Sequence, residues 1–141
     1  DRLVADTERQ EAFRNLFGDE RDDYTEALKR HYATPPDPGY AERFISHYAA
    51  SHPWEDFAET FAHYLHLVDT LETAEQFGFT APKSTADFEA LMTEWYSLTI
   101  ALNSLNRSMG LPDAYPFAIS PVVKRKLGFV HELIYAARRA N

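Results

Sequence analysis

Four ionisable side chains recur at helical spacing near the middle of the chain: Glu55, Glu59, His63 and His66. Residues three or four apart lie on the same face of a helix, so these four form one row if the segment is helical. Carboxylates and imidazoles are zinc ligands, and His63 and His66 have the spacing of a metal-binding pair on one helical face. A solvated helix face normally mixes lysine with glutamate, so this row of two glutamates and two histidines indicates a functional site.

The same residues also fit structural roles. Glu55 falls near the third position of the expected helix, where a carboxylate can complete a capping box. Glu59 then forms a pair on the helix surface, and the two histidines are partly buried polar side chains bonded to neighbours. A metal site formed by His63 and His66, with Asp69 as a third group, is the alternative.

A helix predicted from Pro53 to Phe77 carries this row. Proline suits the first helical turn because its missing N–H has no intrahelical partner there, and Ser51 or His52 then becomes the N-cap. Gly78 ends the helix. Its apolar face repeats at helical spacing and consists of Phe57, Phe61, Tyr64, Leu65 and Val68.

The junction before this helix is polar and contains an aromatic residue. Tyr48 lies one short turn upstream, between His47 and His52. Because an unperturbed imidazole titrates near neutral pH, the junction can change charge in that range. His31 and His131 stand alone in other expected helices and are interpreted as structural.

The remaining segments predict further helices and no sheet. Apolar residues repeat at helical spacing, and no segment alternates with period two over a sustained stretch. The expected helices cover residues 7–17, 24–32, 40–49, 85–108 and 121–138, with Asp22 or Asp23 and Ser120 as candidate caps. The sequence thus predicts an all-α fold, a bundle of about six helices that forms a single domain over residues 1–141.

Composition excludes several classes of function. The net charge of −8 over 141 residues argues against nucleic acid or an anionic membrane as partner. Cysteine is absent, so the chain has no disulfide, thiolate zinc site or cysteine nucleophile. No apolar run is long enough to span a membrane, and a cytoplasmic location is expected. The 141 residues also contain no H-E-x-x-H, G-x-S-x-G or P-loop motif.

The stretch ISHYAASHPWEDFAETFAHYLH, from Ile45 to His66, resembles the putative zinc-binding metallopeptidase family of bacteria. The segments LFGDER at residues 16–21 and DTLETA at residues 69–74 also resemble blocks of that family, and the similarity is closest over residues 1–80. The resemblance implies the chemistry of gluzincins and a gluzincin-like helical peptidase domain. In such enzymes two histidines of an H-E-x-x-H helix and a glutamate from a second helix hold one Zn²⁺.

The resemblance also implies roles for individual residues. The family's E-x-x-A-E pattern matches residues 55–59, so Glu55 is the implied third zinc ligand and Glu59 a carboxylate that supports the ligands from outside. His52 is a further supporting group. Tyr48, seven residues before Glu55, matches the catalytic tyrosine that lies beside the metal in similar gluzincins and can steady the oxyanion.

The family places Asp-Arg-Leu-Val directly after its H-E-x-x-H helix, and this chain opens with Asp1-Arg2-Leu3-Val4. The interpretation is therefore the C-terminal part of a zinc-dependent hydrolase of peptide or protein substrates. With one metal ligand of three, the fragment is expected to bind no zinc and to be inactive alone. A groove left beside the helix from Pro53 is expected to favour self-association.

Two other functions stay open at this stage. The chain can be a helical interaction module without chemistry, in which Glu55 serves only as a cap. It can also be a helical metal-binding protein that uses His63 and His66, and this function predicts that the chain takes up metal by itself.

Overall fold

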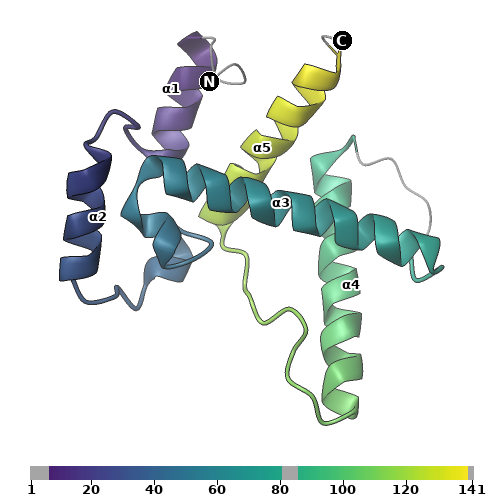
Figure 1. Cartoon of the computed structure of the whole chain (residues 1–141). Helices are drawn as coiled ribbons and strands as arrows, with labels where there is room; N and C mark the ends of the chain where they lie inside the picture. Colours follow the sequence, from purple (N-terminus) through teal and green to yellow (C-terminus); the bar gives the residue numbers. More distant parts are fainter. Residues whose placement is uncertain (1–6, 81–85, 140–141) are drawn as a thin grey trace. The chain divides into compact units, whose positions relative to one another are not determined.

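A computed structural model describes residues 7–80 and 86–139, and every regular element in these two ranges is helical (Figure 1). The elements are α1 (Thr7–Phe17), α2 (Tyr24–Ala33), η2 (Tyr40–Glu42), η3 (Tyr48–Ser51), α3 (Pro53–Gln76), α4 (Phe88–Ser108) and α5 (Pro121–Arg139). The all-α prediction is therefore confirmed, whereas the gluzincin-like arrangement and the single domain stay predictions. The opening motif at residues 1–4 lies outside the described residues.

The prediction of one helix over residues 40–49 is wrong. Two short 3-10 helices, η2 and η3, stand there instead. The carbonyl of Arg43 accepts a hydrogen bond of 2.6 Å from Lys126, and the hydroxyl of Ser46 accepts the backbone N–H of Ala49 at 3.0 Å. These side-chain bonds use backbone groups that a continuous helix needs, so the chain bends between the two elements.

Side-chain caps fix where three of the helices begin. Asp23, one of the two candidates, caps α2 by accepting the N–H of Glu26 at 2.9 Å. Ser120 accepts the N–H of Val123 at 3.1 Å and caps α5, as predicted. Asp87 caps α4. Each cap satisfies an N–H that has no partner inside its helix.

The chain divides into two compact units, which are described separately. The first contains residues 1–64 and 119–141, and the second contains residues 65–118. An aromatic core fills the first unit, where Phe13 and Phe17 of α1 stack at 4.9 Å and Phe129 of α5 meets both rings edge-on. Trp54 and Phe57 of α3 pack against the same core.

A glycine in the left-handed conformation lets the end of α1 pack closely against the start of α3. Gly18 follows the last residue of α1 with φ of +103°, a conformation that side chains disfavour. A Cβ at this position would lie 3.3 Å from Cγ of Pro53, so the backbone approaches the proline closely. The glycine that ends α1 therefore also allows the helix to reach the beginning of α3.

A buried ion pair links α3 to α5. Nζ of Lys126 lies 2.6 Å from Oδ2 of Asp56, and the two side chains are only 2% and 1% exposed. The same ammonium group donates to the carbonyl of Arg43 and lies 4.5 Å from the ring centre of Phe44. Burial raises the pKa of Asp56 to about 6, although Lys126 acts in the opposite direction.

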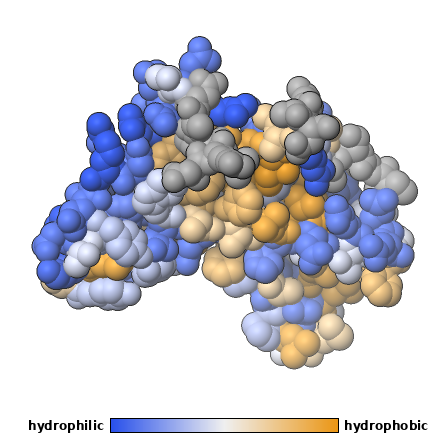
Figure 2. All heavy atoms as spheres, turned by 45° about the horizontal axis from the view of Figure 1, so that its top comes forward, coloured by the Kyte–Doolittle hydropathy of each residue, from blue (hydrophilic) through white to orange (hydrophobic). Residues whose placement is uncertain are grey.

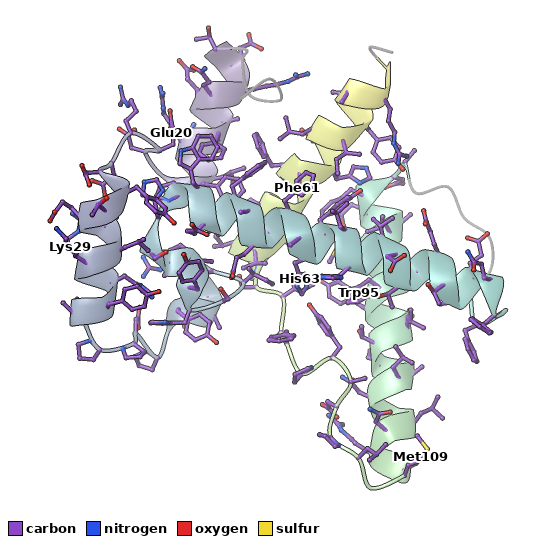
Figure 3. The ribbon with its side chains drawn as sticks, in the orientation of Figure 1. Glu20, Lys29, Phe61, His63, Trp95 and Met109 are labelled. Carbon is purple, nitrogen blue, oxygen red and sulfur yellow. The ribbon has the colours of Figure 1, made fainter. Side chains whose placement is uncertain are left out.

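In the second unit, α4 holds the loop that follows it. Asn103 donates to the carbonyl of Tyr115 at 2.8 Å and accepts its N–H at 2.9 Å. The ring of Tyr115 meets Trp95 edge-on at 4.9 Å, and Trp95 is labelled in Figure 3. Figure 2 shows hydrophobic residues at the surface of the face that it draws, and the exposed ones of this unit include Ile100, Leu105 and Met109.

Among the described helices, none combines the length and the apolar character that a membrane span requires.

The buried pair predicts a large effect of Lys126→Met on stability. The variant keeps a side chain of similar length but leaves the Asp56 carboxylate buried without its cation, which typically costs about 3–5 kcal/mol. Urea denaturation of the 141-residue chain at pH 8, followed by circular dichroism, measures the loss.

The double variant Asp56→Asn with Lys126→Met is the matched control and should recover a large part of this loss, because it removes both charges. The raised pKa of Asp56 gives the sign of the pH dependence: protonation relieves the unpaired charge, so Lys126→Met should lose less at pH 5 than at pH 8. Equal losses at both values would show that the buried charge is not the cause.

Candidate functional site

A carboxylate from α3 and two phenols from other elements meet at the beginning of α3. Oε1 of Glu55 accepts a hydrogen bond from the hydroxyl of Tyr24, the first residue of α2. The side chain of Tyr48 from η3 lies next to the same hydroxyl. The bond to Glu55, followed by the interaction with Tyr48, raises the pKa of Tyr24, so its phenol stays protonated. The structure thus brings together two of the predicted residues, Glu55 and Tyr48, and adds Tyr24.

His52 fixes the angle at which α2 and α3 meet. It is the N-cap of α3, because Nδ1 accepts the N–H of Trp54 at 3.1 Å. Its Nε2 lies 3.1 Å from the carbonyl oxygen of Asp22, and the ring meets Tyr24 edge-on at 5.1 Å. Because Nδ1 accepts a hydrogen bond, the ring proton is assigned to Nε2, which donates to the carbonyl of Asp22. The predicted supporting residue therefore acts through backbone groups and through the ring of Tyr24.

Glu59 supports the turn that presents Tyr48. Its carboxylate accepts a hydrogen bond from the hydroxyl of Ser46. The same hydroxyl oxygen accepts the N–H of Ala49 at 3.0 Å, within η3 and next to Tyr48. Glu59 lies four residues after Glu55 and therefore on the same side of α3. One helix face thus carries Glu55 and also anchors the turn that holds the tyrosine.

The second predicted pair does not form a metal site within the described residues. His63, labelled in Figure 3, is half-buried on α3, and His66 is exposed. In residues 7–80 and 86–139, no group of three or more histidine, aspartate or glutamate side chains is placed to hold a metal ion. A metal bound by His63 and His66 stays a prediction, and it would need further ligands from elsewhere.

The sequence did not indicate several of the residues that position the site. Tyr24 is recognisable in the sequence only as the start of a helix, because a contact with a residue 31 positions away leaves no local pattern. His31 was expected to stand alone, but its ring lies 4.4 Å from that of His47 and 6.4 Å from that of Tyr48. His131, by contrast, is buried and hydrogen-bonded to Tyr64 at 2.8 Å, as a structural histidine should be.

A catalytic zinc ion takes three protein ligands and keeps a fourth position open. The described part of the chain offers one suitably placed carboxylate, Glu55, which is bonded to the phenol of Tyr24. Its oxygen Oε1 is already oriented by Tyr24. These residues fit the contribution of one ligand, and they do not form a complete zinc site.

Comparison with known proteins identifies the family of the chain. The model of a family described as putative zinc-binding metallo-peptidase matches residues 1–133. The match covers nearly the whole chain, so the chain belongs to this family. No solved structure matches it.

Similar proteins occur in mycobacteria. An uncharacterized protein of Mycobacterium bovis and one from each of two Mycobacterium tuberculosis strains are 42% identical to the chain over 130 residues. The alignments cover 86% of this chain but 38% of each relative. The chain therefore spans well under half the length of these relatives.

Two variants of His52 test its role at the junction. His52→Ala removes the cap and the bond to Asp22 and should cost about 1–2 kcal/mol of unfolding free energy. His52→Asn retains an oxygen that can accept the N–H of Trp54, so it should cost about half as much. Urea denaturation measures both losses, and equal losses would show that the cap makes no contribution.

Proposed function

We propose that the chain is part of a zinc-dependent peptidase in which Glu55 is one of the zinc ligands. The observation that carries this proposal is the placement of the Glu55 carboxylate in the first turn of α3, where it is bonded to Tyr24 of α2, whose other neighbour is Tyr48 of η3. Membership of the zinc-binding metallopeptidase family supports it. When bound, zinc polarises the peptide carbonyl and lowers the pKa of the attacking water.

Tyr24 orients the proposed ligand. Its hydroxyl is bonded to Oε1 of Glu55, so the carboxylate that would hold the metal is kept in a defined direction. A hydrogen bond from outside the ligand sphere fixes the direction of a ligating side chain and typically affects metal affinity. His52 packs against the ring of Tyr24 and holds the start of α2, so it maintains this orientation indirectly.

We propose that Tyr48 is the group that contacts the substrate. A phenol can donate a hydrogen bond to an oxygen that gains negative charge during peptide hydrolysis. Such a donor is effective only when it is already in position, because reorganisation during the reaction costs free energy. Glu59 and Ser46 supply this rigidity through the turn that contains Tyr48.

The proposal requires two zinc ligands and a general base from residues outside these 141. The longer mycobacterial relatives are consistent with this requirement. We further propose a peptide or protein substrate and a cytoplasmic location. The 141-residue chain alone should then show neither stoichiometric zinc nor peptidase activity.

Replacing Glu55 by glutamine in the full-length protein tests the central assignment. Glu55→Gln keeps the size of the side chain but removes the charge that balances Zn²⁺. Zinc affinity should fall by more than the roughly 10- to 100-fold that is typical when a supporting residue is lost. Zinc titration against wild type, with peptidase assays in parallel, measures the effect.

Glu59→Gln is the matched control, because it makes the same chemical change one turn further along the same helix. It should weaken zinc binding less, within the range for a supporting group. If Glu59→Gln loses more affinity than Glu55→Gln, the two assignments are reversed. If neither variant changes affinity, the zinc peptidase proposal fails.

A further inference from the structure

A cavity of about 360 Å³ lies in the first unit, among α2, η3 and the beginning of α3. Ligand pockets begin at about 300 Å³, so the cavity is large enough for one small molecule or side chain. Half of its twelve lining residues are apolar, among them Phe17, Phe44, Ala50 and Pro53. These side chains favour the burial of an apolar group against them.

One buried polar atom in the cavity wall has no partner in the described residues. Ser51 lines the cavity and is only 7% exposed, and its hydroxyl makes no hydrogen bond there. Leaving a buried hydroxyl unpaired is unfavourable, so buried polar groups normally have partners. The next residue, His52, also lines the cavity, but both of its ring nitrogens are already bonded. Among the buried polar side chains of the lining, Ser51 is therefore the one with hydrogen-bonding capacity to spare.

The charges on the cavity wall cancel. Arg30 and Asp22 form an ion pair of 2.5 Å, and both side chains are largely exposed, so they lie toward solvent. Both ring nitrogens of His52 already have backbone partners. A charged ligand would lose its hydration without finding an unpaired opposite charge in this lining, and that loss is costly.

We propose that the cavity binds a neutral, mostly apolar group that carries one hydrogen-bonding atom, which pairs with the hydroxyl of Ser51. A phenol has this chemistry. The cavity adjoins the candidate site, since its lining residue His31 lies 6.4 Å from Tyr48, ring to ring. If the proposed peptidase function holds, this group is a substrate side chain, and the enzyme prefers residues such as tyrosine.

The test uses the metal-free 141-residue chain and four small aromatic probes. Phenol, toluene, benzoate and benzylamine are titrated separately, and amide NMR shifts of residues 49–52 report binding. Phenol should bind best, and toluene several-fold to about tenfold more weakly, because it lacks the hydroxyl. Benzoate and benzylamine, which are charged at neutral pH, should bind more weakly than phenol.

Two variants locate the binding. Ser51→Ala should reduce the affinity for phenol to that for toluene and leave toluene unchanged or slightly improved. Ala50→Leu should fill the cavity and abolish binding of both probes, and its circular dichroism spectrum should show that the chain still folds. Equal binding of phenol and toluene by wild type, or no effect of Ser51→Ala, would overturn the proposal.

The result is independent of the zinc assignment. If phenol binds as expected but Glu55→Gln leaves zinc affinity unchanged, the cavity is a ligand site of a protein with another function. If phenol fails to bind but Glu55→Gln abolishes zinc binding, the peptidase function stands and the cavity does not select its substrate.

Discussion

The arrangement of the first unit depends on the buried ion pair between Asp56 and Lys126. Burying two charges costs almost as much as their attraction returns, so such a pair contributes little net stability compared with well-packed apolar residues. In this unit the ion pair instead sets the orientation of α3. The ammonium group of Lys126 meets Asp56 on α3, the carbonyl of Arg43 and the ring of Phe44 at the same time. This fixes the rotation of α3 about its axis and hence the direction of Glu55, the residue before Asp56.

Around this anchor, the candidate site is assembled from neutral hydrogen-bonding groups rather than from further charges. Tyr24 and Tyr48 are phenols, and Ser46 bonds to the second carboxylate, Glu59. Neutral donors can stabilise a carboxylate without cancelling its charge, and the zinc ligand proposed above needs that charge. An arginine in place of Tyr24 would hold the carboxylate more strongly but would make it a poorer ligand.

Much of this fold follows from local sequence. The helix ends can be predicted from a few residue types. These are proline at the first position of α3 and α5, aspartate or serine at the caps, and glycine after α1 and α3. The helices of the structure begin and end within a few residues of these positions. The prediction of one helix over residues 40–49 was wrong because Arg43 and Ser46 form hydrogen bonds with distant residues. Hydrophobic periodicity does not reveal such bonds.

The site was predicted less completely than the fold. The resemblance to the metallopeptidase family led to Glu55, Glu59 and Tyr48. The contacts of Tyr24, His31 and Lys126 join residues that are far apart in the sequence, and such contacts depend on packing. Nothing in the sequence around Lys126 distinguishes it from a surface lysine of an amphipathic helix.

The spacing of Glu55, Asp56 and Glu59 makes this part of the gene intolerant of length changes. One α-helical residue turns the chain by about 100°, so one inserted or deleted codon between the first and last of these positions would point them to different sides of α3. The loop at residues 34–39 has no such angular constraint, because its irregular backbone can absorb an added residue. Natural length variation among relatives should therefore collect in the loop and be excluded from the first two turns of α3.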